Sequence, residues 1–383
     1  MKKQAFFVKA TLAVALAIFS STAAMGQQDS TAIQNGSSEK KSTAFYQKIL
    51  GENAPDWLKD VSSRIKLHGY AQGGYTYSHK GGANTNTFDL KRVLFWAEAR
   101  ITDRWSFLFM HDFSSVVQEF YTDYRITKNK ALTVRLGQFK NGLSLENPLS
   151  PTSMEAIDVY SEAVTFLTGC GSDPLFGVQY GRDLGLSLFG ETNSGKFRYE
   201  LDVMNGQGIN KKDGNNFKDI ITRLEYRPAK GLNLVATGQF GRGHAIAYSL
   251  YNPKLFNLET GKGLDYKRHR CTIGADYKSK AFNVHGEYLN GWDGDAHSWG
   301  AYVTGAVPLG TPKVEFVGSY DFFNFNTDLG MDQHKAIAGF QYWFFKKCRV
   351  QLQYVYKNAY IAGGQFVHGA NHAIMGQMQI RFN

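Results

Sequence analysis

The chain has 383 residues and a formal net charge of +10, with 40 glycines, 28 phenylalanines and 21 tyrosines but only 8 prolines. This composition is unusual for an ordinary soluble domain and is typical of β-strands that carry aromatic girdles. Beyond the first 26 residues, no apolar run approaches the ~18 residues of a transmembrane helix, which excludes a helical membrane protein. The three cysteines, Cys170, Cys271 and Cys348, match no metal-site spacing, and we treat them as incidental.

The first 26 residues have the features of a secretory signal peptide. The positively charged start contains Lys2, Lys3 and Lys9. A short apolar run at 12–19 follows, and Ala24 and Gly26 form a small-residue cleavage site. We expect cleavage before Gln27 and no lipoprotein anchor, because no cysteine follows the site. Loss of the three lysines lowers the charge to +7. That balance favours acidic solutes or lipid A phosphates over nucleic acid, although solubility alone explains it equally well.

Residues 27–65 are the only part of the mature chain without strand character. The stretch QQDSTAIQNGSSEKKST is polar, and polar segments of low hydrophobicity are commonly flexible. We expect a periplasmic N-terminal segment here. A linker and a segment that helps subunits associate both stay open as interpretations.

From residue 66 onward the chain alternates apolar and polar residues, which places successive side chains on opposite faces of a strand. In 88–101, for example, Val93 and Phe95 share one face, and Arg92 and Arg100 share the other. Short gaps between the segments alternate with long ones. The predicted strands are 66–77, 88–101, 105–113, 119–127, 131–139, 174–191, 196–205, 217–227, 232–241, 267–278, 281–291, 298–307, 313–325, 334–345, 348–357 and 372–383.

The number of strands, sixteen, depends on two decisions. We take 174–191 as one strand, because dividing it at Arg182–Asp183 would give seventeen, and bacterial barrels formed by one chain have even numbers. The last segment, HAIMGQMQIRFN, can pair with the first and leave the sheet without an edge. A soluble sandwich would need neither the gap pattern nor apolar faces rich in tyrosine and phenylalanine. The sequence therefore predicts an all-β fold, a transmembrane antiparallel β-barrel over 66–383, wide enough to hold water.

A long insert separates the fifth and sixth predicted strands, at 141–172. It has prolines early, a segment at 154–167 with apolar residues at roughly helical spacing, and no lysine or arginine. Its acidic residues are Glu146, Glu155, Asp158 and Glu162. Loops of this length are usually functional or disordered. A surface lid is one interpretation; the other, which the barrel pattern favours, is a third extracellular loop folded into the lumen as a constriction.

Several stretches resemble porins of the phosphate-selective O and P family, found in outer membranes of Bacteroidota. They are RLGQFKNGLSLE, GVQYGRDLGLSLFG, YELDVMNGQG and the ending QMQIRFN, and the resemblance covers most of 66–383. It implies a sixteen-stranded trimeric barrel in the outer membrane that carries small hydrophilic solutes, anions such as phosphate, along a ladder of basic residues. The acidic insert departs from the family, whose phosphate-specific members present Lys or Arg at the constriction. A general, weakly selective porin therefore stays open.

In a porin, the polar faces of the strands line the solute pathway. Strand parity gives the basic candidates Arg92, Arg100, Arg125, Arg135, Arg198, Arg223, Arg268 and Arg270, and Lys140 stands just before the insert. A row of fixed cations lowers the barrier for anions, and arginine suits bidentate contact with oxyanions. The alternative is that these arginines pair with carboxylates on the same faces and only hold a solvated wall.

The expected partners are outer-membrane lipids and lipopolysaccharide, the barrel assembly machinery through the C-terminal strand, and two further copies in a homotrimer; no nucleic acid is expected. We expect no catalytic residue, metal or cofactor. His368 and His372 fit solvated histidines, and Asp293-Gly294-Asp295 fits a plain turn. The competing functions are an outer-membrane enzyme, for which no positioned triad is visible, and an adhesive or structural barrel with a plugged lumen.

Overall fold

The computed structural model describes residues 63–170, 172–173, 177–178 and 180–382. The chain divides into two units, 1–66 and 67–383, and the second holds the barrel. The signal peptide predicted at 1–26 and nearly all of the segment predicted at 27–65 lie outside the described residues.

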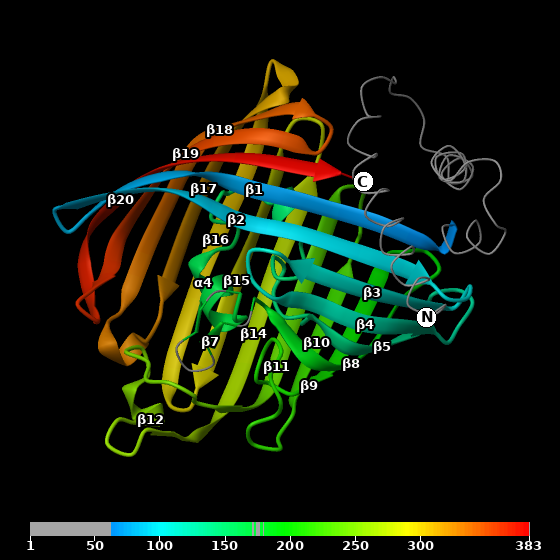
Figure 1. The fold of residues 1–383 in the computed structure, drawn as a ribbon, viewed down its shortest axis with the longest axis horizontal. Coiled ribbons are helices and arrows are strands. Elements are labelled where there is room, and N and C mark those ends of the chain that lie inside the picture. Colours follow the sequence, from blue (N-terminus) through cyan, green and yellow to red (C-terminus); the bar gives the residue numbers. More distant parts are fainter. Residues whose placement is uncertain (1–62, 171, 174–176, 179, 383) are drawn as a thin grey trace, which may run out of the picture. The chain divides into compact units, whose positions relative to one another are not determined.

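Sixteen strands form one closed barrel in which each strand pairs with its neighbours in the chain (Figure 1). β1 and β20 close the ring antiparallel, from the Gly69–Phe382 pair to the Lys80–Asn371 pair. This confirms the predicted fold and strand number. The strands are β1 (Ile65–Lys80), β2 (Ala83–Arg100), β3 (Trp105–Asp112), β4 (Val117–Arg125), β5 (Thr133–Lys140), β8 (Arg182–Glu191), β9 (Phe197–Met204), β10 (Asp219–Tyr226), β11 (Leu232–His244), β14 (Asp265–Lys278), β15 (Asn283–Asp293), β16 (Ala296–Leu309), β17 (Thr311–Asn324), β18 (Asp332–Phe345), β19 (Cys348–Ala362) and β20 (Gln365–Phe382).

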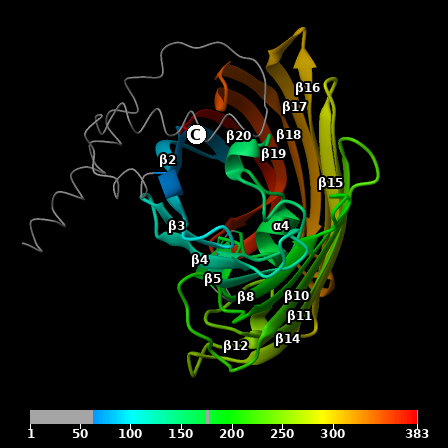
Figure 2. The same ribbon diagram turned by 90° about the vertical axis from the view of Figure 1, so that its right-hand side faces the viewer.

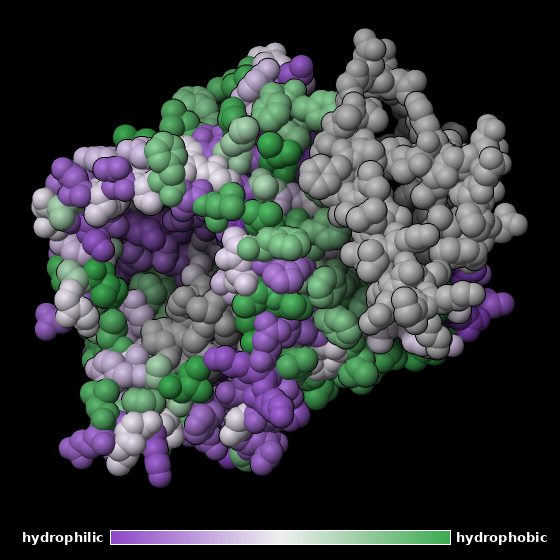
Figure 3. Space-filling view, in the orientation of Figure 1, coloured by the Kyte–Doolittle hydropathy of each residue, from purple (hydrophilic) through white to green (hydrophobic). Residues whose placement is uncertain are grey.

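The outer face of the barrel is apolar and the inner face is polar. On β19, Gln351 and Gln353 are buried inside, whereas Leu352 between them is 58% exposed on the outside. Hydrophobic side chains cover much of the outer face of β1 to β4 in Figure 3, and hydrophilic ones line the hollow on its left. Closure satisfies the backbone of every strand within the sheet, as a transmembrane β-structure requires.

Between β5 and β8 lie the smaller elements of the insert: η1 (Pro151–Ser153), α4 (Glu162–Leu167), and the short pair β6 (Ser172–Asp173) and β7 (Gly177–Val178). Between β11 and β14 lie η2 (Pro253–Leu255), β12 (Phe256–Asn257) and β13 (Lys262–Gly263), and η3 (Thr327–Leu329) precedes β18. Across the described residues, no helix is both long and apolar enough to cross a membrane.

The strand expected at 174–191 begins only at Arg182, so the insert runs to residue 181 rather than 172. A sharp turn separates the two parts: Tyr180 and Gly181 both have positive φ, +54° and +67°. The alternation of 182–191 continues backwards through this turn in the sequence, which is why periodicity alone did not find it.

The expected loops at 80–86 and 358–371 are largely strand. β1 and β2 meet at a two-residue turn, Gly81–Gly82, with φ values of +58° and +80°, as a tight hairpin requires. Here polar side chains pair with each other across the strands: Ser78 and Thr85 hydroxyls lie 2.7 Å apart. The tips of β1 and β2 lack an apolar face, so 80–86 looks like a loop in the sequence. The gaps therefore do not alternate strictly between short and long.

Candidate functional site: the insert and the interior of the barrel

The insert crosses the interior and is bound to the opposite walls. Its backbone N–H groups donate to inward side chains of three strands: Leu145 N to Glu287 Oε1 of β15 (2.8 Å), Ile157 N to Gln353 Oε1 of β19 (2.8 Å) and Glu162 N to Asp321 Oδ2 of β17 (2.6 Å). Figure 2 shows α4 inside the ring of strands. The prediction that the third long loop folds into the lumen is confirmed.

Helix α4 fixes the middle of the insert. The Ser161 hydroxyl accepts a hydrogen bond from Val164 N and caps the helix. The buried face of the helix packs on inward apolar residues of β15, β16 and β17; this cluster includes Val164, Phe166, Leu167, Leu289, Tyr302 and Phe323. This apolar patch on the inner wall is the surface on which the helix packs.

Lys140, expected near the constriction, holds the insert instead of facing open solvent. Its Nζ donates to the carbonyl oxygens of Asn147 (2.8 Å) and Leu149 (2.6 Å) and to the Tyr160 hydroxyl (3.1 Å). All three acceptors belong to the insert. The ammonium group therefore donates to two backbone carbonyls and one phenol hydroxyl of the insert.

Two of the four insert carboxylates are held by side chains of the barrel wall. Glu162 lies 3.0 Å from Lys335 Nζ and 2.7 Å from Lys357 Nζ. Burial opposes the ionisation of Glu162, but the two lysines outweigh it and hold the pKa of this carboxyl well below its usual range. Glu146 accepts from Ser161 N (2.9 Å) and lies 3.0 Å from His285 Nε2. The insert therefore presents less negative charge to the lumen than its sequence suggests.

Glu155 and Asp158 each line a cavity. Glu155, with Arg198 and Asp276, lines a cavity of about 360 Å³ on the side of the insert toward the short turns. Asp158 is exposed and lines a cavity of about 280 Å³ with Lys80 and Lys357, on the inner wall of β1, β2, β19 and β20.

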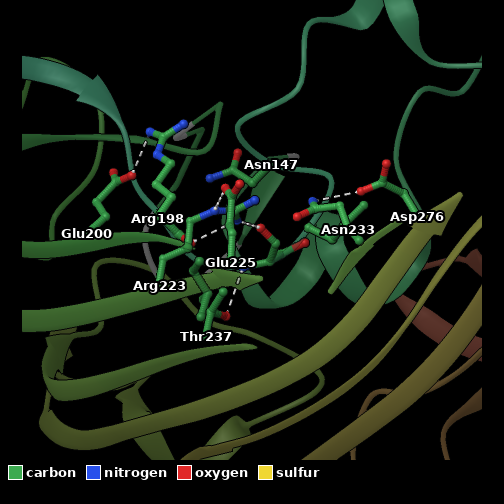
Figure 4. A network of polar contacts seen from close by, with 12 residues as sticks. Asn147, Arg198, Glu200, Arg223, Glu225, Asn233, Thr237 and Asp276 are labelled. Carbon is green, nitrogen blue, oxygen red and sulfur yellow. Dashed lines mark hydrogen bonds and ion pairs between the residues drawn. The ribbon is translucent and has the colours of Figure 1, made fainter. Parts of the chain in front are cut away.

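Five of the predicted basic residues are paired with carboxylates of the barrel wall. These pairs are Arg135–Asp123 (2.7 Å), Arg198–Glu200 (3.2 Å), Arg223–Glu225 (2.7 Å), Arg268–Asp219 (2.7 Å) and Arg270–Asp293 (2.9 Å). Figure 4 shows two of them with their surroundings. Arg223 also donates to Gly142 O (3.3 Å) and to Ser144 O, and Arg270 donates to Leu167 O, so both help to hold the insert. For these five arginines, the observed contacts agree with the alternative that they pair with carboxylates of the wall.

Arg92 and Arg125 face the interior without such pairing. Arg92 donates to Gln72 Oε1 at 3.2 Å, and within the described part of the chain neither arginine has a carboxylate within salt-bridge distance. Arg125 lines a cavity of about 260 Å³ at the end of the barrel that carries the short turns. Arg100 lies at the end of β2 near the same rim and is exposed.

No family model matches this chain, and no curated protein matches it in sequence. Its structure is similar to that of the anion-selective porin from Comamonas acidovorans, with a TM-score of 0.60 at 13% identity over 83% of this chain and 99% of that one. It is also similar to Salmonella typhi OmpF in complex with daunomycin (TM-score 0.59, 12% identity, 83% and 97%) and to the trimer form of Vibrio cholerae OmpT (0.53, 14%, 83% and 100%). At these identities the likeness shows the fold: a sixteen-stranded porin barrel.

Sequence reasoning missed the cations on the last strands. Lys335 and Lys357 bind Glu162, while Arg349 donates to Met154 O (2.6 Å) and Arg381 to the Thr152 hydroxyl. Strand parity would have found them, because they share a face with the buried Gln351 and Gln353 or with Gln377 and Gln379.

The residues that the structure describes contain no group of three or more ligating side chains that could hold a metal ion. Within the same residues, the three cysteines are free thiols.

Proposed function

We propose that this chain is an outer-membrane porin, a passive channel for small hydrophilic solutes with a modest preference for anions. The observation that carries the proposal is a closed sixteen-stranded barrel with a polar interior, narrowed by an insert that is tied to the opposite wall. Barrels of this size enclose an aqueous lumen rather than a packed core. An insert held by ion pairs and hydrogen bonds narrows such a lumen to a fixed passage, as a filter for small solutes requires.

The proposed anion preference rests on which charged side chains lack an ion-pair partner. At the rim with the short turns, Asp123 pairs with Arg135, and Glu191 lies 3.7 Å from Lys130. Arg104 and Arg125 line the same cavity and have no carboxylate within salt-bridge distance among the residues described here. Two uncompensated guanidinium groups at a mouth raise the local anion concentration.

Three interior carboxylates without an ion pair among the described residues are out of reach of solutes. Asp183, Asp202 and Glu287 are at most 5% exposed, and each accepts a backbone N–H bond: from Gly206, Gly142 and Leu145 respectively. These carboxylates therefore bind the backbone of loops and are not presented to solutes. Asp158 and Asp276 still border open cavities, so the preference should be modest.

The finer assignment is also a proposal: a member of the phosphate-selective O and P group, exported by the signal peptide at 1–26 and assembled as a homotrimer. It is supported by the quoted stretches and by the likeness to an outer-membrane protein recorded in trimer form. We further propose that lipopolysaccharide surrounds the barrel and that the C-terminal strand is the signal for the assembly machinery. Phosphate is the anion that this group would carry, and chloride competition would distinguish it from a general anion pore.

The pore itself is tested by single-channel recording of the refolded full chain in a planar bilayer. We expect stepwise conductance increments that scale with salt concentration. The absence of any conductance in correctly folded protein would overturn the proposal in favour of a plugged structural or adhesive barrel, and hydrolysis of a lipid or peptide would favour an enzyme.

A further inference from the structure

The histidines of this chain are distributed unevenly over the barrel. Two of the ten, His68 and His285, face the interior, where they contact Trp96 and Glu146. The other eight lie at the end of the barrel from which the insert leaves β5. Seven of them have the strand parity of the outer face, whereas His368 is the partner of the buried Ala359 across a register shift and follows the inner face. The seven outward histidines are His79, His111, His244, His269, His297, His334 and His372.

The opposite rim, with the short turns, carries aromatic residues instead. Trp105, Tyr226, Phe282, Tyr342 and Phe345 are all at least 40% exposed there. Among the described strands, this second rim has no outward histidine. Tyrosine and tryptophan are common at both interfaces of a transmembrane barrel. In this chain, only one of the two rims carries outward histidines in addition to aromatic residues among the described strands.

Strand pairing joins several of these histidines into a lateral row. His79 of β1 is the direct partner of His372 of β20, and His372 is the partner of Tyr356 of β19. Further around the barrel, His334 of β18 is the partner of Phe322 of β17. His297 of β16 is the partner of Trp292, and the two rings stack at 4.9 Å.

Two hairpins repeat the same arrangement of a tyrosine and a histidine. Tyr320 Oη lies 2.6 Å from His334 Nδ1, and Tyr354 Oη lies 2.6 Å from His372 Nδ1. In both pairs the tyrosine stands on the preceding strand, two positions from the residue directly opposite the histidine. The phenol thus occupies Nδ1 of each imidazole, and Nε2 of His334 lies 4.0 Å from Asp332 Oδ2.

The rim histidines differ in how close a carboxylate lies. His244 Nδ1 is 2.6 Å from Asp265 Oδ1, and Asp332 is 4.0 Å from His334 Nε2. The hydrogen-bonding neighbours of three other rings are uncharged: Asn84 for His79, Asn290 and Thr327 for His297, and Tyr354 for His372. A proton gained by one of these three rings is not balanced by an ion pair among the described residues, and an external anion can balance it.

We propose that this histidine rim binds the phosphate groups of anionic lipid headgroups and binds them more tightly as its imidazoles protonate. Outward side chains at the strand ends of a transmembrane barrel meet the headgroup layer. Histidine with an ordinary pKa of about 6.5 changes charge within the range that a cell surface experiences. Each added basic charge at an anionic surface favours binding by about fivefold.

The test measures the preference of the folded full chain for phosphatidylglycerol over phosphatidylcholine, from quenching of tryptophan fluorescence by brominated phosphatidylcholine in mixed vesicles. Trp292 and Trp299 lie beside the rim and report on it. Between about pH 8 and about pH 5.5, we expect the preference of the natural chain to rise by about fivefold or more. His334→Gln with His372→Gln should remove most of that rise.

The control is His68→Gln, which removes an inward histidine and should keep the full rise. Tyr320→Phe with Tyr354→Phe keeps both imidazoles and should also keep it, because the charge and not the phenol attracts the lipid. If the His334 and His372 variant does not fold, His79→Gln with His297→Gln gives the same comparison. A lipid preference that is independent of pH in the natural chain, or a rise that survives loss of the histidines, would overturn the proposal.

Discussion

The carboxylate of Glu162 lies 3.0 Å from the ammonium group of Lys335, so an ion pair joins the insert helix to β18 on the far wall of the barrel. Lys357 of β19 reaches the same carboxylate at 2.7 Å. The side chain of Lys335 is only 4% exposed, and breaking a buried pair leaves an uncompensated charge. Asp321 also lies 3.4 Å from Lys335, so the Glu162 contact is one of several that hold the insert across the lumen.

Replacing Glu162 by Gln should loosen the insert around α4. The substitution leaves Lys357 without its carboxylate and Lys335 with Asp321 alone, 3.4 Å away, and loss of one partner of a buried pair costs up to about 3 kcal/mol. We expect larger and noisier single-channel currents and faster proteolysis within 141–170. Asp158→Asn removes a charge from the same insert at an exposed position and should change stability by less than about 0.5 kcal/mol. Equal behaviour of the two variants would contradict the role of the ion pair.

The same ion pair predicts how the insert responds to acid. The pKa of Glu162 is depressed in the folded state, so its contribution is fully present above the unfolded value of about 4.3 and is lost only as the pH falls through the lower folded value. Proteolysis of the insert should therefore stay slow at about pH 4.5 and accelerate only in stronger acid. A transition centred near the ordinary glutamate pKa would show that the carboxylate is not paired in the folded protein.

Gly181→Ala should destabilise the barrel more than a change in backbone freedom explains. A Cβ at this position would lie 1.9 Å from Asn147 Oδ1, and Asn147 cannot move aside because its amide donates to Asn141 and Gly181. Gly195 has the same φ of +67° with nothing within 4 Å of its Cβ position. Gly195→Ala thus measures only the backbone strain of alanine at positive φ, about 1 kcal/mol. We expect Gly181→Ala to lower the melting temperature more than Gly195→Ala does. Equal losses would mean that Asn147 rearranges freely.

Strand parity predicted the barrel because inward glutamines and arginines alternate with outward apolar residues, as in Gln351, Leu352 and Gln353. It also placed most of the basic residues on the correct face. It did not reveal the partners of those residues, because they lie far apart in the chain: Glu162 meets residues 335 and 357. Ion pairs across a lumen depend on where a loop crosses it, and no local pattern encodes that crossing.

The edges of the strands were harder to predict for a physical reason. The tips of β1 and β2 are held by polar pairs such as Ser78–Thr85, which lack the apolar alternation that marks a strand in a sequence. The acidity of the insert was misleading in a similar way. Glu146 and Glu162 bind groups within the protein and hold the insert in place. Their carboxylates are therefore not presented to a solute.

The most direct test of the account is the reversal potential of the full chain in a planar bilayer under a salt gradient. We predict a modest anion preference that falls toward zero in Arg104→Gln with Arg125→Gln and does not change in Lys254→Gln with Lys262→Gln. The second pair removes the same charge from exposed positions of the 245–264 loop, where salt screens it beyond about 8 Å. A natural chain that prefers cations, or one whose selectivity is the same in both variants, would contradict the claim that the unpaired arginines at the rim attract anions.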